Sequence, residues 1–217
     1  MTSTTPLPTP RTPIGRIPVV DVGPTAENGR WPTKAVVGEV VPIRATVFRE
    51  GHDAVAATLV LTSPDGRVAA STPMTYLNKG LDLWSATVIP DAEGDWTFHV
   101  EGWSDPWGTW THDADIKVPA GIDVEMMLAE GALLLDRAAT GAHGPARTAY
   151  VAAAKALRVT KTPPLQRLAA ARSQEITDLL ATDPLRDYVT ASAAHPPRVH
   201  RARALAGSWY ELLPRPA

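Results

Sequence analysis

The feature that most constrains the fold of this chain is a change in the spacing of its apolar residues near residues 119–121. Before this point apolar and polar residues alternate, as in Ile43, Ala45 and Val47. Such alternation places one face of a strand in a core and the other face in water. Over residues 124–138 the apolar residues instead recur every three or four positions, which is the spacing of an amphipathic helix. The pattern predicts two folding units, strands first and helices second.

The first unit is predicted over residues 16–121. Turn-forming Gly, Pro, Asn and Asp residues separate its alternating runs. Five to eight short strands at this spacing indicate an antiparallel β-sandwich, immunoglobulin-like in general architecture. Residues 1–15 are dominated by Thr and Pro, and we expect them to be a disordered tail. The further runs that predict strands are Ala57/Leu59/Leu61, Trp84/Ala86/Val88, Trp96/Phe98/Val100 and Trp110/His112/Ala114/Ile116/Val118.

The second unit, residues 122–217, is predicted to be a small α-helical bundle. Asp123 is the expected N-cap of its first helix, and Pro145 suits the first turn of its second. Short Gly and Pro connections separate the amphipathic segments, so neighbouring helices are expected to be antiparallel. The fold class is therefore α+β with two domains. The expected helices cover residues 124–138, 146–158, 165–180, 185–194 and 199–210.

The composition agrees with this division and excludes several classes of function. Residues 1–121 carry 9 Lys and Arg against 14 Asp and Glu, whereas residues 122–217 carry 12 against 9. The formal net charge of -2 is too close to zero for electrostatic binding of nucleic acid or a membrane surface. The chain has no cysteine, which excludes disulfides, thiolate metal sites and a cysteine nucleophile. With no membrane-length apolar run and no apolar signal core, we expect a cytoplasmic protein without nucleic-acid or membrane partners.

The sequence contains no motif that carries chemistry by itself. It has no phosphate-cradling Gly-rich loop and no Gly-x-Ser-x-Gly turn, and its six histidines never fall at metal-ligand spacing. His99 and His112 could face each other on adjacent strands, with Glu101 or Asp113 nearby. A solvated polar sheet face is the favoured interpretation of the same residues. We therefore predict no catalytic residue, no metal site and no cofactor, and we assign no substrate-binding residue.

The most unusual local feature is three tryptophans in eight residues, Trp103, Trp107 and Trp110, around a Pro/Gly turn. The favoured interpretation is that Trp103 and Trp110 anchor two strands in the core and leave only Trp107 near the surface. A protein or domain interface and a sugar-stacking platform are the alternatives.

Several segments resemble the amino-terminal region of actinobacterial α-1,4-glucan:maltose-1-phosphate maltosyltransferases. The resemblance covers roughly residues 16–217, and its longest run, from 29 to 53, is the most specific. Residues 209–215 resemble the segment that leads into the catalytic barrel of that family. The segments that carry the resemblance are RIPVVDV (16–22), GRWPTKAVVGE (29–39), ATVFREGHD (45–53), GDWTF (94–98), WSDP (103–106) and LAEGA (128–132).

The resemblance implies the amino-terminal portion of an enzyme that builds α-glucan from maltose 1-phosphate. In that family a β-sandwich and a helical segment help to form a homodimer, and a (β/α)8 barrel follows. There an aspartate forms a β-glycosyl-enzyme and a glutamate activates the acceptor, with net retention. No barrel strand is present in this sequence, so we expect no catalytic residue and no activity of this chain alone, with α-glucan and maltose 1-phosphate bound only by the full enzyme. A free-standing carbohydrate-binding or protein-interaction module is the alternative.

Overall fold

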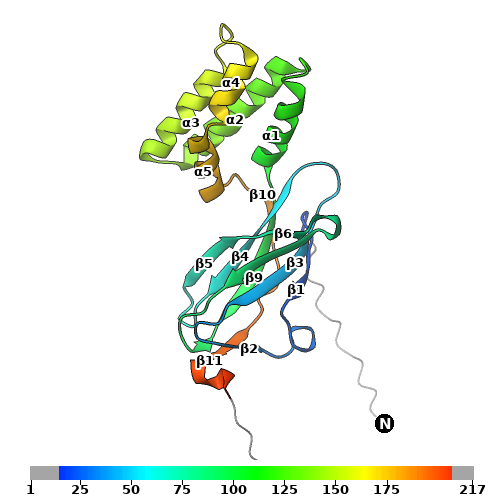
Figure 1. Ribbon diagram of the computed structural model, residues 1–217, viewed down its shortest axis with the longest axis vertical. Helices are drawn as coiled ribbons and strands as arrows, with labels where there is room; N and C mark the ends of the chain where they lie inside the picture. Colours follow the sequence, from blue (N-terminus) through cyan, green and yellow to red (C-terminus); the bar gives the residue numbers. More distant parts are fainter. Residues whose placement is uncertain (1–14, 207–217) are drawn as a thin grey trace, which may run out of the picture.

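The computed structural model describes residues 15–206, in which helices and sheets occupy different ends of the molecule (Figure 1). The strands are β1 (Val19–Gly23), β2 (Thr33–Val36), β3 (Val41–Val47), β4 (Val55–Thr62), β5 (Val68–Pro73), β6 (Thr75–Asn78), β7 (Leu83–Val88), β8 (Gly94–Asp95), β9 (Thr97–Ser104), β10 (Asp187–Ala191) and β11 (Pro197–His200). The helices are α1 (Pro106–Lys117), α2 (Val124–Gly141), α3 (Gly144–Leu157), α4 (Pro164–Ala171) and α5 (Gln174–Thr182), with short 3-10 turns η1 (Glu27–Gly29), η2 (Lys79–Leu81) and η3 (Ala202–Leu205).

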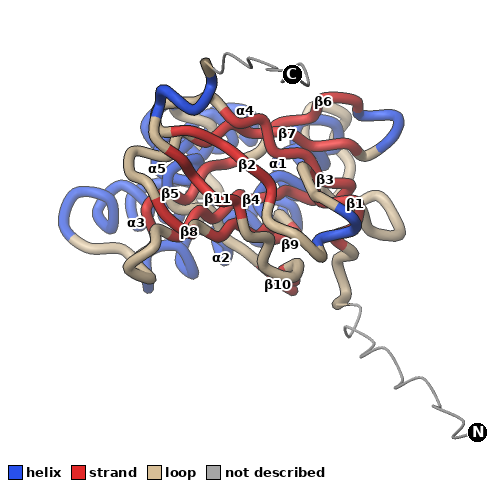
Figure 2. The backbone as a smooth tube through the Cα atoms, turned by 90° about the horizontal axis from the view of Figure 1, so that it is seen from below, coloured by secondary structure: helices blue, strands red, loops and turns tan. Residues whose placement is uncertain are grey.

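The strands form three sheets, which we call together the sheet unit. Two sheets have four antiparallel strands each, in the orders β1-β3-β7-β6 and β10-β9-β4-β5. A small third sheet, β2-β11-β8, pairs β2 and β11 in parallel and covers the end of the sheet unit seen in Figure 2. Side chains from the two larger sheets share one core. Ile43, Ala45 and Val47 of β3 and Phe98 and Val100 of β9 belong to it, as the alternation predicted.

Strand β4 departs from the predicted alternation. Its residues Thr58 and Val60, expected on a solvated face, are buried like their neighbours on the core side. These residues are buried because other side chains pack on the outer face of this sheet. The indole of Trp103 lies there and donates from Nε1 to Oγ1 of Thr58 at 3.0 Å, and β4 is flanked by β9 and β5 on both sides.

The five α-helices form the helical unit, which has a core of its own. Helices α2 and α3 confirm the first two predicted helices, and Pro145 lies in the first turn of α3. Asp123 occupies the predicted N-cap position, but its side chain makes no capping hydrogen bond. The third predicted helix is divided into α4 and α5, because Ser173 begins a new helix by accepting a hydrogen bond from the Ile176 N–H.

The prediction of a strand from Trp110 to Val118 was wrong, because these residues lie in and just after helix α1. The alternating apolar residues fit a helix equally well, since Trp110, Ala114 and Val118 are four residues apart and share a face. These three are buried in the helical core, whereas His112 and Ile116 are exposed. The change from strands to helices therefore falls at Pro106 and not at the predicted junction of 121 and 122.

The two helices predicted near the carboxyl end were also wrong. Residues 185–194 contain strand β10, which pairs with β9, and residues 197–200 form β11. The remainder of the predicted helix over 199–210 is η3 up to Leu205, and its last residues lie outside the described range, as do residues 1–14 of the predicted tail. The helical unit is thus an insertion between two neighbouring strands of one sheet, and segment 122–217 contributes to both units. Within residues 15–206, no helix is long and apolar enough to cross a membrane.

Candidate functional site at the joint of the two units

The two connections between the units run side by side. Strand β9 leads into α1 through Asp105, and α5 returns to β10 through residues 183–186. No α-helix in the described part of the chain packs along a strand of the large sheets. The position of the helical unit therefore depends on the residues at this joint.

Asp105 is the N-cap of α1. Its Oδ1 accepts a hydrogen bond from the Gly108 N–H at 2.8 Å, and its own N–H donates to the Ala54 carbonyl at 2.9 Å. Burial raises the pKa of the Asp105 carboxyl, and hydrogen bonds from the Gly108 and Trp107 N–H groups partly oppose this shift. The residue connects the start of the first helix to the loop before β4.

Arg186 reaches from the return connection across the outer face of β9. Its Nη2 pairs with Oε2 of Glu101, and its guanidinium lies over the ring of Trp103 at 5.4 Å from the centroid. The other oxygen of Glu101 lies 3.6 Å from Nε2 of His99. Nε of Arg186 is buried and has no hydrogen-bond partner. Arginine, carboxylate, indole and imidazole thus form one continuous cluster on the sheet.

A second set of polar contacts holds the other side of the joint. Arg137 of α2 donates from both terminal nitrogens to the carboxylate of Asp187, at 2.5 and 3.2 Å. The N–H of Ala54 donates to Oγ1 of Thr109 in α1 at 2.8 Å. Arg49 donates to Oγ of Ser104 at 2.6 Å, at the end of β9. Bidentate arginine pairs fix orientation as well as distance, so the Arg137–Asp187 pair, together with the Ala54–Thr109 bond, holds the helical unit at a defined angle.

A cleft of about 430 Å³ opens between the end of α5 and the outer face of β4 and β5. Small-molecule sites are often found in such clefts between units. The indole of Trp103 in its wall is buried, and the guanidinium of Arg186 lies over its ring, so it offers no free stacking face. The lining residues are Ala56, Ala57, Thr58, Ser71, Pro73, Met74, Trp103, Asp105, Leu180, Ala181, Thr182, Asp183, Pro184 and Arg186.

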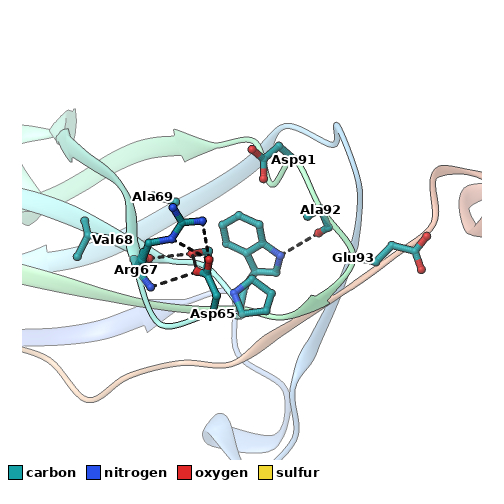
Figure 3. A pocket seen from close by; sticks show the side chains of 10 residues that line it. Asp65, Arg67, Val68, Ala69, Asp91, Ala92 and Glu93 are labelled. Atoms are coloured by element: carbon teal, nitrogen blue, oxygen red, sulfur yellow. Dashed lines mark hydrogen bonds and ion pairs between the residues drawn. The ribbon is translucent and has the colours of Figure 1, made fainter.

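A larger hollow of about 610 Å³ lies at the turn between β4 and β5 (Figure 3). In it Asp65 faces Arg67, with Oδ2 to Nη2 at 2.6 Å. Hydrogen bonds from Arg67, and then from Ser63, hold the pKa of the Asp65 carboxyl well below its usual range. Both partners are exposed, so the pair forms a turn rather than a catalytic dyad. Asp91 and Glu93 add negative charge on the opposite side.

The three clustered tryptophans do not lie on two strands joined by a turn, because Trp107 and Trp110 belong to helix α1. Trp103 and Trp110 are both buried, as the favoured interpretation had it, but in different cores: Trp103 lies on β9 and Trp110 in α1. Trp107 is half-buried, with its ring centroid 4.5 Å from that of Trp110. A sugar-stacking platform made of all three side chains is therefore excluded.

The less favoured alternative, in which His99 faces His112 on an adjacent strand, is excluded, since His112 lies on an exposed face of helix α1. The nearness of Glu101 to His99 is confirmed, because the two residues share the outer face of β9. No group of three or more His, Asp and Glu side chains within residues 15–206 could hold a metal ion.

The joint residues Arg137, Arg186 and Asp187 were missed by the sequence interpretation. Arg186 and Asp187 fall in a segment predicted to be helical, and the partners of all three are 50 to 85 residues away in sequence. A local pattern carries no signal for contacts at such separations. Only the pairing of β10 with β9 brings these side chains together.

Comparison with known proteins shows the relationship of this chain. A sequence model of the family α-1,4-glucan:maltose-1-phosphate maltosyltransferase, domain N/S, matches residues 15–201. Maltosyltransferases 2 and 1 of Streptomyces coelicolor are 54% and 50% identical over 93% and 94% of this chain, and 30% of each relative is covered. The maltosyltransferase of Mycolicibacterium smegmatis is 42% identical over 93% of this chain and 33% of its own length. The chain thus spans about a third or less of the length of these relatives.

Proposed function

We propose that this chain, which belongs to the α-1,4-glucan:maltose-1-phosphate maltosyltransferase family and matches its domain N/S, serves as the non-catalytic scaffold portion of such an enzyme. The observation that carries the proposal is the match over residues 15–201 with relatives of which the chain spans only about 30%. The reaction of the whole enzyme is the one its relatives' names describe, transfer of maltosyl from maltose 1-phosphate to an α-1,4-glucan. The carboxylates that perform it belong to the portion that this chain does not span.

The scaffold role is supported by the construction of the joint. Arg137, Arg186 and Asp105 fix the helical unit to the sheet unit through directed polar contacts. A fixed angle allows the two units to present one rigid surface to another part of the enzyme.

We also propose that the sheet unit and the helical unit form a homodimer, and that the two large sheets have an immunoglobulin-like arrangement. We propose a cytoplasmic location as well. The maltosyl donor in the relatives' names, maltose 1-phosphate, is a charged sugar phosphate and does not cross a membrane unaided. Light scattering on the chain at tens of micromolar tests the dimer. A mass that stays monomeric would contradict it.

The scaffold proposal is tested by measuring phosphate release from maltose 1-phosphate with a maltooligosaccharide acceptor. Three samples are compared: this chain alone, a chimera in which it replaces the corresponding portion of the Streptomyces coelicolor maltosyltransferase 2, and that relative without its N/S portion. We expect release only from the chimera. Release by this chain alone, or full activity of the relative without its N/S portion, would overturn the proposal.

The alternative, a free-standing carbohydrate-binding module, loses support from the burial of Trp103 and Trp110. Among the described residues Trp31 is the exposed tryptophan, and its Nε1 already donates to Glu27 at 3.1 Å. Titration of the chain with maltooligosaccharides at millimolar concentration distinguishes the two functions. Heat of binding together with a change in tryptophan fluorescence would favour the module.

A further inference from the structure

The end of the sheet unit farthest from the helices carries an exposed apolar surface, which we call the exit patch: Val40, Ile89, Ala204 and Leu205. The described chain leaves the sheet unit here, through β11 and η3 (Figure 1). Val40 and Ile89 are each 58% exposed and Leu205 is 68% exposed. Scattered apolar residues are common on protein surfaces. These four residues indicate a binding surface only if their side chains are contiguous.

Register places Val40 beside Ile89. Val41, the first residue of β3, pairs with Val88, the last residue of the antiparallel strand β7. Val40, just before β3, therefore lies opposite Ile89, just after β7. The Gly38 N–H donates to the Pro90 carbonyl at 2.9 Å and holds the two segments together. The two side chains therefore form one exposed apolar face.

A hollow of about 330 Å³ adjoins this face and includes Ala204 and Leu205 in its wall. Its floor is formed by Ala35 and Val36, which are buried in the sheet unit, and its rim carries Glu39. An apolar floor with a polar rim is the form of a pocket that takes an anchoring side chain from a partner protein.

The hollow is formed by rigid backbone. The Val36 N–H donates to Oε2 of Glu39 at 2.9 Å, and the Val37 N–H donates to the His200 carbonyl at 2.9 Å. These bonds join the turn after β2 to the end of β11. A pocket that is already formed costs little ordering on binding.

We propose that the exit patch is the docking surface for the catalytic portion of the enzyme, with an apolar side chain of that portion seated in the hollow. This inference rests on the proposed function. The relatives extend well beyond the share that this chain spans, and the described chain leaves the sheet unit at this patch through β11 and η3. The helical end, in contrast, is at the opposite pole of the molecule (Figure 1).

The first experiment compares amide hydrogen exchange of the 217-residue chain with that of the chimera described above. Docking excludes water from residues 36–40 and 87–89, so exchange of their amides is expected to slow roughly tenfold or more in the chimera. Exchange on the exposed faces of α2 and α3 is expected to stay unchanged. Equal exchange at 36–40 and 87–89 in both proteins would overturn the proposal, whatever the activity of the chimera.

The second experiment uses the double variant Val40→Lys with Ile89→Lys in both proteins. The isolated chain should keep its unfolding midpoint because both side chains are exposed. In the chimera the variant should return exchange at 36–40 to the rate of the isolated chain and lower the unfolding midpoint. Val151→Lys, a half-exposed position on α3, is the matched control and should change neither.

Hydrogen exchange and maltosyl transfer together distinguish docking at the exit patch from the proposed scaffold function. Slowed exchange at the patch without maltosyl transfer would support docking and contradict the proposed function. Maltosyl transfer with unchanged exchange at the patch would leave the function standing and overturn docking at this surface. An equal effect of the Val151→Lys and patch variants on the chimera would also count against docking.

Discussion

At the scale of single residues, Gly131 shows how a contact that no local pattern reveals can determine a residue type. It lies in the middle of α2, where glycine is unfavourable. A Cβ at this position would lie 2.1 Å from Cζ2 of Trp110. Trp110 is buried and donates from Nε1 to the Met127 carbonyl at 2.7 Å. Glycine therefore allows α1 to approach α2 closely enough for the indole to fill the core.

Gly131→Ala is expected to destabilise the protein by about 1–3 kcal/mol, because the methyl group overpacks the Trp110 site. In an open helical position the same change would stabilise by up to about 1 kcal/mol, so the sign of the effect is diagnostic. Urea denaturation followed by circular dichroism at 222 nm measures it. Gly141→Ala is the control, since no neighbouring atom lies within 4 Å of that Cβ, and it should cause no loss. A stabilising Gly131→Ala would show that Trp110 does not occupy this position.

At the scale of elements, the predicted strands and helices are correct where the apolar residues fit only one spacing. They are wrong where the same residues fit both the spacing of a strand and that of a helix. Strand β3 and helices α2 and α3 each have one clear period, and the structure confirms them. The apolar residues of helix α1 also fit a strand, because they satisfy both a spacing of two and a spacing of four. The local signal that distinguishes them was present: Asp105 followed by Pro106 is the expected start of a helix.

The cap of α1 gives a prediction at this scale. Asp105→Ala is expected to cost about 1 kcal/mol of stability because the side-chain acceptor for the Gly108 N–H is lost. Asp105→Asn keeps an acceptor and removes the buried charge, so its stability should equal or exceed that of the parent protein. Chemical denaturation at pH 7 compares the three proteins. Equal losses in the two variants would show that the carboxylate charge, rather than the cap, matters here.

At the scale of the whole molecule, the joint decides how the two units are placed. The helical unit is attached by two connections and by side chains that lie far apart in sequence. Glu101 and Arg186 are each about three-quarters buried, with side-chain exposures of 22% and 28%. Such a pair contributes more than a fully exposed one, since water screens it less.

A double-mutant cycle with Arg186→Met and Glu101→Gln is expected to give a coupling energy of about 1 kcal/mol. The cycle subtracts the loss of the His99 contact that Glu101→Gln also causes. The matched control is the exposed pair of Arg198 and Asp95, for which we expect a coupling near zero. The free energy of unfolding is the quantity measured. Equal coupling energies in the two pairs would show that the Arg186–Glu101 pair stabilises the joint no more than an exposed surface ion pair does.

The sequence by itself determined the two kinds of unit, the core faces of most strands and helices, and the family, because these depend on local periodicity and on residue identity along the chain. It also placed His99 beside Glu101, since residues two apart on a strand share a face. Only the tertiary structure decided that the chain returns to the sheets after α5, that Arg186 and Arg137 clasp the joint, and that Val40, Ile89 and Leu205 share one end of the molecule. These features are set by pairing between distant strands, and the free energy of such pairing depends on partners that no local window contains.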